Sequence, residues 1–179
     1  MTAYIEITPR DVVKYELDKA SGLLKVDRPQ QTSSSPPTLY GFIPQTYCGP
    51  AVAAMSPETD VGDGDPLDIC VFSERPIDRA DIVLPARVLG GLRMVDGGEA
   101  DDKIVAVLAN DTLYQSAETL SDIPIHMIDR LEHYFQTYKM IPGSTTTVLI
   151  AERYEVDHAH LVVEAAIADY KTEIVGADD

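Results

Sequence analysis

The sequence predicts a mainly β protein with some helix, built as one small barrel with helices packed outside it. Most of the chain consists of short apolar segments separated by turn residues at irregular spacing, which is typical of a small barrel. Helical periodicity appears only around residues 125–138 and after residue 157. With 179 residues, 45% of them apolar, the chain can bury one core, so we expect residues 1–179 to form a single domain.

The first third of the chain alternates between strand composition and turn residues. Ala20-Ser21-Gly22 supplies a turn, so the strands on either side of it are expected to pair as a hairpin. The Pro- and Ser-rich residues 28–37 cannot hold a sheet ladder and predict a loop. Residues 44–62 are a second irregular stretch; of a lid, a subunit contact and a plain surface excursion, we favour the excursion. The predicted strands are residues 3–8, 12–18, 23–27 and 39–43.

Strands and two helices are predicted in the rest of the chain. Residues 81–95 form one bent strand or two strands interrupted at Gly90-Gly91, and further strands are predicted at 68–72, 103–109 and 145–151. One helix begins near Ser121 or Asp122 and ends before Gly143, and a last helix runs from Asp157 to about Lys171. The apolar stripe of the first helix is Ile125, Ile128, Leu131, Phe135 and Tyr138. That of the last helix is Leu161, Val162, Ala165 and Ala168.

The charge of the chain argues against nucleic acid as a partner. There are 30 acidic and 14 basic residues, and the formal net charge of −16 would repel phosphates rather than neutralise them. The longest apolar runs fall short of the ~18 residues of a membrane span, and residues 1–6 lack the pattern of a signal peptide. We therefore expect a cytoplasmic protein with no membrane partner. Cys48 and Cys70 form no CxxC pair and are expected to be reduced thiols.

The segment from Gly62 to Asp68 is the most informative part of the sequence. It places three carboxylates within six residues, at the entrance to a predicted strand. Like charges at this spacing raise one another's pKa unless cations are present. Gly64 and Pro66 make the segment bent and rigid. Hard cations with oxygen ligands are therefore the natural partners of Asp63, Asp65 and Asp68.

Other readings of the acidic segment can be tested on spacing. A solvated acidic turn is the commonest fate of such residues and stays open. An EF-hand fails because, counted from Asp63, the fifth loop position is Leu67, which has no oxygen ligand. An aspartyl-phosphate enzyme would place its Asp pair after an apolar strand, whereas here the apolar run follows. A second acidic segment, residues 96–103, predicts a hairpin turn, and it would form the second wall of a polynuclear metal site if the barrel brings both segments together.

Several short motifs occur in an order that resembles the family I soluble inorganic pyrophosphatases. The signature is Asp-Gly-Asp-Pro-Leu-Asp at residues 63–68, and the resemblance extends from Glu6 to Lys139. Each motif alone is weak, but the ordered set is specific. The other matching motifs are Ile5-Glu6-Ile7, Lys14-Tyr15-Glu16, Val26-Asp27-Arg28, Tyr40-Gly41-Phe42-Ile43, Met94-Val95-Asp96, Asp101-Asp102-Lys103 and Tyr138-Lys139.

The resemblance implies an OB-type five-stranded β-barrel with flanking α-helices, pyrophosphate as the small-molecule substrate, and a homo-oligomer. It also implies several Mg²⁺ ions per site, for which Mn²⁺ or Zn²⁺ could substitute. The implied metal ligands are Asp63, Asp68, Asp96 and Asp101, and the implied catalytic residue is Asp65, which activates the attacking water. The implied substrate-binding residues are Lys14, Arg28, Tyr40, Lys103, Tyr138 and Lys139. Glu6 and Glu16 are expected to support the site.

Two positions depart from the family pattern. Pro36 stands where the bacterial pattern has a tyrosine, and Ser144 stands where many members have a lysine. Both replacements remove a group that could hold phosphate. Residues 44–62 are also longer than the matching stretch in compact bacterial members.

The residues support the chemistry that the resemblance implies. Bare aspartates would repel pyrophosphate, and divalent cations that bridge the two reverse this interaction. We expect Mg²⁺-dependent hydrolysis of pyrophosphate to two phosphates by direct attack of a metal-activated water. Three alternatives stay open: a metal-dependent phosphohydrolase acting on another phosphate compound, a non-enzymatic OB-fold binding module, and a family member that has lost activity. The low aromatic content, 7%, counts against the binding module.

Overall fold

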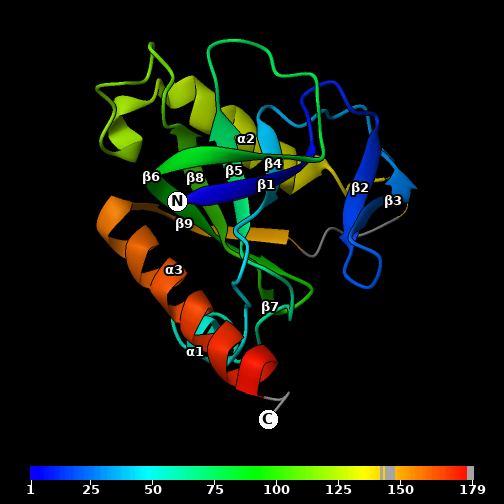
Figure 1. Ribbon diagram of the computed structural model, residues 1–179, viewed down its shortest axis with the longest axis vertical. Helices are drawn as coiled ribbons and strands as arrows, with labels where there is room; N and C mark the ends of the chain where they lie inside the picture. Colours follow the sequence, from blue (N-terminus) through cyan, green and yellow to red (C-terminus); the bar gives the residue numbers. More distant parts are fainter. Residues whose placement is uncertain (142, 144–147, 177–179) are drawn as a thin grey trace.

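Five strands close into a barrel in the computed structural model, which describes residues 1–141, 143 and 148–176. Each strand pairs with the next in the ring, and β6 pairs back with β1. The pairs are antiparallel except for β5 with β8, which run parallel. The predicted five-stranded OB-type barrel is therefore confirmed (Figure 1). In ring order the strands are β1 (Thr2–Ile7), β4 (Leu39–Phe42), β5 (Asp68–Phe72), β8 (Lys103–Leu108) and β6 (Ile82–Asp96).

Among the described residues, four further strands lie outside this ring. β7 (Glu99–Ala100) and β9 (Val148–Glu155) both pair with β6 and extend the sheet. β2 (Val13–Asp18) and β3 (Leu23–Pro29) form the predicted hairpin as a separate sheet, which projects to the right of the barrel in Figure 1. β3 continues to Pro29, so the loop begins later than predicted. Of the strand predicted at 145–151, the first three residues lie outside the described residues, and β9 runs on to Glu155.

The long strand β6 is one bent strand rather than two. Its register with β8 shifts between Val88 and Gly90, as expected for a β-bulge. A Cβ on Gly90 would lie 2.4 Å from the backbone oxygen of Tyr154, and one on Gly91 would lie 2.3 Å from the Tyr154 ring. The two glycines therefore allow β9 to approach β6 closely at the bend.

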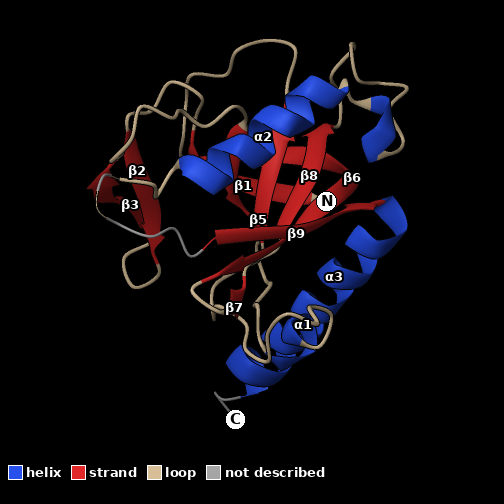
Figure 2. Cartoon of the chain, turned by 180° about the vertical axis from the view of Figure 1, so that it is seen from behind, coloured by secondary structure: helices blue, strands red, loops and turns tan. Residues whose placement is uncertain are grey.

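The helix α2 (Ile125–Thr137) covers one face of the barrel sheet (Figure 2). It begins later than predicted, because residues 120–122 form a separate 3₁₀ turn, η1 (Leu120–Asp122), and Pro124 is the N-cap of α2. Ile125 is 56% exposed and lies outside the buried stripe, contrary to expectation. The residues that pack against Cys70 and Phe72 of β5 include Ile128, Leu131, Tyr134 and Phe135.

The last helix, α3 (Val156–Asp169), packs against the opposite face of the sheet and continues into the π-helical turn η2 (Tyr170–Val175). The predicted stripe is wrong at two positions, because Leu161 is 53% exposed and Ala168 is also exposed. The side chains that α3 buries are Ala159, Val162, Val163, Ala166 and Asp169. The buried face of α3 includes the carboxylate of Asp169, and a search that counts only apolar residues does not place a carboxylate on a buried face.

Residues 44–62 are not a plain surface excursion, so that expectation is wrong. They contain the short helix α1 (Pro50–Ala53), which lies beside α3 in Figure 1. Cys48, Val52, Ala53 and Ser56 are buried, and the first two belong to the core that includes the inner face of α3. Both cysteines of the chain are free, as predicted, and both are buried. Within the described part of the chain, every helix is too short or too polar to span a lipid bilayer.

Candidate active site

The two acidic segments lie side by side, as a shared metal site requires. Gly62 forms a parallel bridge with Ala100, and the backbone N–H of Asp63 donates to the Ala100 carbonyl oxygen at 3.2 Å. Gly97 and Gly98 have φ values of 64° and 92°, which glycine adopts without strain, and they form the tight turn between β6 and β7. The turn predicted from Asp96 to Lys103 is therefore present, and it brings the second acidic segment against the first.

Asp68 and Lys103 begin two neighbouring parallel strands and are partners in register. The Lys103 ammonium lies 2.5 Å from Oδ2 of Asp68 and also contacts the Asp101 carboxylate. The hydroxyl of Tyr40, on β4, donates to Asp68 as well. Burial alone would lower the pKa of Lys103, but Asp101 and Asp68 raise it well above its ordinary value. Lys103 is therefore a charged counter-ion at the centre of the acidic group.

Asp63 and Asp101 are crowded carboxylates. Burial raises the pKa of both, and the charge of Asp101 raises that of Asp63 further. Lys103 acts in the opposite direction on both groups. With no cation beyond Lys103, these two carboxyls hold protons more tightly than free aspartic acid. A divalent ion that binds here would act in the same direction as Lys103, because positive charge favours the ionised carboxylates.

Asp65 lies between these groups in sequence but is more exposed than they are. Its backbone N–H donates to Oδ1 of Asp63 at 3.0 Å, which fixes the turn. Its own carboxylate lies 3.1 Å from Nζ of Lys19, in the β2–β3 hairpin turn. Both side chains are more than 60% exposed, so this ion pair contributes little stability. Lys19 was not predicted, because its only sequence signal was a positive charge in a hairpin turn.

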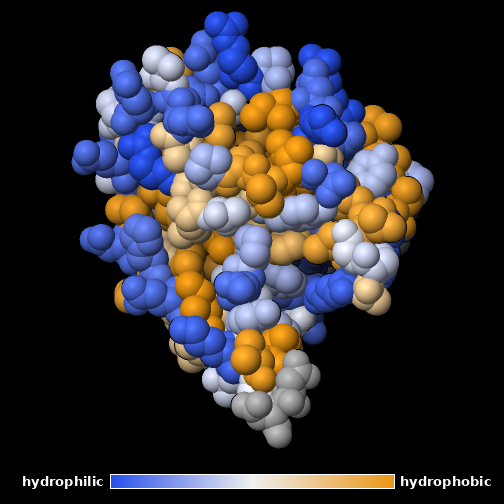
Figure 3. Space-filling model, in the orientation of Figure 1, coloured by the Kyte–Doolittle hydropathy of each residue, from blue (hydrophilic) through white to orange (hydrophobic). Residues whose placement is uncertain are grey.

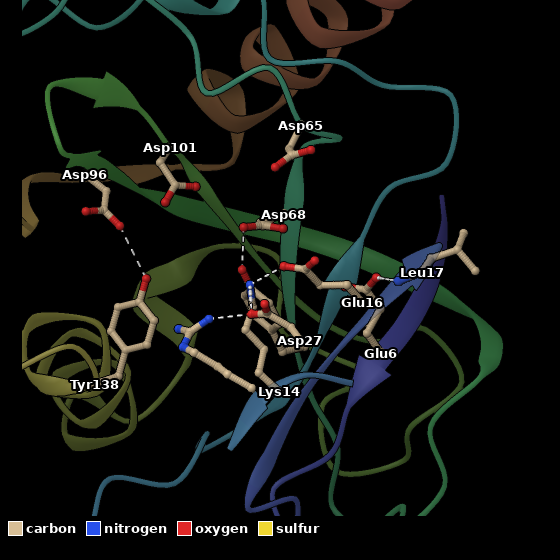
Figure 4. A network of polar contacts seen from close by, with 12 residues as sticks. Glu6, Lys14, Glu16, Leu17, Asp27, Asp65, Asp68, Asp96, Asp101 and Tyr138 are labelled. Atoms are coloured by element: carbon tan, nitrogen blue, oxygen red, sulfur yellow. Dashed lines mark hydrogen bonds and ion pairs between the residues drawn. The ribbon is translucent and has the colours of Figure 1, made fainter. Parts of the chain in front are cut away.

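The end of α2 forms another wall of the site. The ammonium of Lys139 contacts the Asp96 carboxylate, and the Tyr138 hydroxyl lies 3.5 Å from Oδ2 of the same residue. Figure 4 shows Asp96 and Asp101 together on one side, with Tyr138 pointing toward them from the helix. The predicted pair at residues 138–139 therefore reaches the loop that carries Asp96.

The β2–β3 hairpin supplies the basic groups of the third wall. Lys14 lies 2.5 Å from Glu16 and 3.3 Å from Asp27, and Arg28 lies 2.5 Å from Asp27. Asp27 was not predicted as a site residue. The hairpin register pairs Lys14 with Arg28 and Tyr15 with Val26, so Asp27 is the extra residue of a β-bulge. Regular strand alternation would place Asp27 on the face opposite Arg28, so strand period alone could not identify it.

Glu6 connects the hairpin to the barrel. One of its carboxylate oxygens accepts the backbone N–H of Leu17 at 2.6 Å, which ties β2 to β1. Glu6 is 8% exposed, and burial raises its pKa to about 7 although the Leu17 hydrogen bond acts in the opposite direction. Its position fits the supporting role that the resemblance implied.

The predicted site residues and Lys19 line one cavity of about 1160 Å³, whereas Asp27 is not part of its lining. Sequence reasoning therefore selected groups that the fold brings together from six separate parts of the chain. The predicted site residues that line the cavity are Glu6, Lys14, Glu16, Arg28, Tyr40, Asp63, Asp65, Asp68, Asp96, Asp101, Lys103, Tyr138 and Lys139. Pro36 is buried and does not line it, and Ser144 lies outside the described residues.

Comparison with known proteins identifies the family. A family model described as inorganic pyrophosphatase matches residues 3–171. The chain belongs to the inorganic pyrophosphatase family. The inorganic pyrophosphatase of Chlamydia caviae is 48% identical over 180 aligned residues, which cover 95% of this chain and 83% of that protein. The one from Halalkalibacterium halodurans is 36% identical over 94% of both chains. The resemblance to the family I pyrophosphatases is thus confirmed.

Solved structures of inorganic pyrophosphatases share the fold. The Helicobacter pylori structure matches with a TM-score of 0.82 and 32% identity, covering 96% of this chain and 93% of that one. The Thermus thermophilus structure matches with a TM-score of 0.81 and 31% identity, covering 96% and 91% of the two chains. The barrel and its flanking helices are therefore the pyrophosphatase fold.

The donor set fits a hard divalent cation such as Mg²⁺. The acidic groups offer oxygen ligands, and burial together with neighbouring carboxylates raises the pKa values of Asp63 and Asp101 despite the charge of Lys103. Among the described residues, no three His, Cys, Asp or Glu side chains converge closely enough to enclose an ion. Lys103 lies between Asp68 and Asp101 instead. Metal binding in this pyrophosphatase fold would therefore require these side chains to change rotamer.

Proposed function

We propose that the chain hydrolyses inorganic pyrophosphate to two phosphates, with Mg²⁺ as cofactor and water attacking phosphorus directly. The observation that best supports this is the common cavity, which gathers every predicted acidic and basic site residue in a member of the pyrophosphatase family. Acidic groups alone would repel pyrophosphate, and basic groups alone would not activate water. The cavity provides both.

Four carboxylates are proposed to hold the metal ions. All four lie on the two adjacent acidic segments, and Asp96, at the start of the β6–β7 turn, also contacts Lys139 at the end of α2. When bound, the ions would neutralise pyrophosphate oxygens and lower the pKa of water toward neutrality. All-oxygen ligation favours Mg²⁺, and Mn²⁺ or Zn²⁺ could replace it.

Asp65 is proposed to accept the proton of the attacking water. It is the most exposed carboxylate of the 63–68 segment, and its backbone is anchored to Asp63, so it can reach a water without losing a buried partner. The bases would hold phosphate oxygens and stabilise the charge that develops on the departing phosphate. In the structure, Lys14 pairs with Glu16 and Arg28 pairs with Asp27. When pyrophosphate binds, its oxygens must replace these carboxylates as the partners of the two bases.

Phosphate release from pyrophosphate tests this function directly. Purified protein with Mg²⁺ should release phosphate, and Asp65→Asn should lower the turnover about 10²-fold or more while the fold survives. Asp60→Asn is the matched control, because Asp60 is exposed, lies five residues earlier and does not line the cavity. A folded wild-type protein that binds Mg²⁺ yet releases no phosphate would refute the proposal.

A second candidate function is hydrolysis of a larger phosphate compound. The cavity volume of about 1160 Å³ lies above the ordinary range of small-molecule sites, roughly 300–1,000 Å³, and leaves room for more than two phosphates. Comparison of pyrophosphate, ATP and a phosphomonoester at equal Mg²⁺ separates the two functions. We expect kcat/KM to be highest for pyrophosphate, and a higher value for ATP would favour the second candidate.

We also propose a cytoplasmic homo-oligomer with no nucleic-acid or membrane partner. Apolar side chains are exposed on the face shown in Figure 3, over the β2–β3 hairpin and the start of β6. Leu23, Val26 and Val83 are 68%, 63% and 67% exposed. Light scattering should give a mass that is a multiple of 19.6 kDa. A monomer across the accessible concentration range would contradict the assembly.

A further inference from the structure

We propose that Asp169, at the end of α3, is a positioning residue for the metal-binding segment 63–68 and acts through the backbone of Cys48. The inference rests on the proposed metal-dependent function and concerns a residue outside the catalytic cavity. Asp169 does not line that cavity, and 101 positions separate it from Asp68 in the sequence. Its contacts nevertheless lead to the segment that carries Asp63 and Asp65.

The carboxylate of Asp169 is buried and bound by backbone amides. Its Oδ2 accepts the N–H groups of Gly49, Ala51 and Val52, each at 3.0 Å, and its Oδ1 accepts that of Ala51 at 2.9 Å. The residue is 5% exposed. A buried carboxylate is costly unless its oxygens are hydrogen-bonded, and buried amides are costly unless they find acceptors. Each side of this contact therefore holds the other in place.

This contact determines where α1 lies. A helix of four residues is not stable alone, and its first N–H groups have no partner within the helix. A Cβ on Gly49 would come 3.1 Å from the carboxyl carbon of Asp169, so glycine permits the close approach. The backbone N–H of Tyr47 adds a second link to α3, donating to Ala166 at 3.0 Å. The segment 47–52 is thereby fastened to the last helix.

Cys48 carries this attachment to the metal-binding segment. Its N–H donates to the Asp65 carbonyl oxygen at 2.8 Å, and its own carbonyl oxygen accepts the N–H of Gly64 at 3.0 Å. A Cβ on Gly62 would lie 2.2 Å from the same carbonyl oxygen, so the two backbones are in direct contact. Any shift of Gly49 moves Cys48, and with it the backbone between Asp63 and Asp65.

A residue that only stabilised the fold would change unfolding but leave metal affinity alone. Asp111 provides the comparison within the same chain. It is 7% exposed and accepts backbone N–H groups of Glu74 and Leu113 at 2.7 and 2.9 Å. It follows the end of β8, whereas Lys103 and the site lie at the beginning of that strand. Asp111→Ala therefore removes a similar buried carboxylate far from the metal-binding segment.

Direct binding of Mn²⁺, followed by electron paramagnetic resonance, tests the inference without an activity assay. Asp169→Ala should raise the Mn²⁺ dissociation constant about tenfold, the size expected for residues that support metal ligands. Asp111→Ala should leave it unchanged, and Asp169→Asn, which keeps one acceptor oxygen, should restore most of the affinity. Wild-type affinity in Asp169→Ala, or an equal loss in Asp111→Ala, would overturn the inference.

Thiol labelling provides a second measurement that does not require the alanine variant to fold. If Cys48 and the metal ligands are coupled, Mn²⁺ should slow the labelling of Cys48 in the wild-type protein, because coupling is reciprocal. Cys70, also buried, serves as the internal control. We expect at least threefold protection of Cys48 relative to Cys70, and less in Asp169→Asn. Equal protection of both thiols would overturn the inference. Absence of phosphate release alone would refute the hydrolase and leave both binding measurements valid.

Discussion

Asp68 and Lys103 face each other at the start of two parallel strands, with the ammonium nitrogen 2.5 Å from a carboxylate oxygen. Lys103 is 2% exposed and contacts Asp101 on its other side. Taking an ammonium out of water costs several kcal/mol, so it must be compensated by partners of opposite charge. The lysine is therefore part of the structure of the site as well as a candidate phosphate ligand.

Replacement of this lysine should destabilise the metal-free protein. Lys103→Met keeps most of the side-chain volume but leaves Asp68 and Asp101 without a counter-charge, so the free energy of unfolding should fall by about 3–5 kcal/mol. Saturating Mg²⁺ should recover part of the loss, because a cation can replace the ammonium. Urea unfolding with EDTA and with Mg²⁺ measures both effects. Lys171→Met, at an exposed position outside the cavity, is the control. An unchanged stability would show that the buried carboxylates are protonated instead.

Glu6 should make stability fall as pH rises. Its pKa is about 7 in the folded state against 4.5 ordinarily, so between these values the folded state binds more protons than the unfolded state. The stability that protonated Glu6 contributes is fully present below pH 4.5 and is lost as the pH rises toward 7. Glu6→Gln keeps the oxygen that accepts the Leu17 N–H and removes the titration.

Unfolding of metal-free protein at pH 4.5 and pH 8 measures this effect. The stability of the Gln variant relative to wild type should increase by about 3 kcal/mol between the two pH values. A relative stability that does not change with pH would place the pKa of Glu6 near its ordinary value.

The acidic part of the site could be predicted from the sequence because its information is local. Three carboxylates around Gly64 and Pro66 specify a bent segment with oxygen ligands before any fold is known. The barrel could be predicted because its strands are short apolar segments, such as 68–72, separated by turn residues at irregular spacing. The order of the motifs then supplied the basic residues.

The rest could not be predicted because it depends on contacts between distant residues. The carboxylate of Asp169 accepts the backbone N–H of Gly49, which lies 120 positions earlier in the sequence. No local sequence pattern predicts a hydrogen bond between residues so far apart. The stripe of α3 was misplaced for the same reason, because periodicity treats a polar residue as exposed. Residues 44–62 have the composition of a tolerated insertion. Buried side chains among them pack in the core that includes α3, and this contact between distant parts of the chain has no local sequence signal.

Gly41 should be intolerant of any side chain. A Cβ there would lie 1.9 Å from the Tyr4 carbonyl oxygen and 2.9 Å from the Ile5 Cα, both of them backbone atoms of the paired strand. Gly41→Ala should therefore cost at least about 3 kcal/mol, at the upper end of overpacking effects. Gly22→Ala is the control, because nothing lies within 4 Å there and only the positive φ of 70° opposes it, at about 1–2 kcal/mol. Thermal unfolding should rank the two variants in that order, and the reverse order would contradict the close approach of β1 and β4.

Divalent metal should stabilise the folded protein more than salt does. A chain with a net charge of −16 gains stability from any screening ions, so the control for MgCl₂ is NaCl at the same ionic strength. At 100 times its dissociation constant, a ligand specific to the folded state adds about 2.7 kcal/mol. For a chain of this size we expect Mg²⁺ to raise Tm by about 5–10 °C beyond NaCl. Asp101→Asn should lose most of that difference while responding normally to NaCl. If both salts raise Tm equally, the aspartates are screened by diffuse ions, and the crowded carboxylates do not form a metal site.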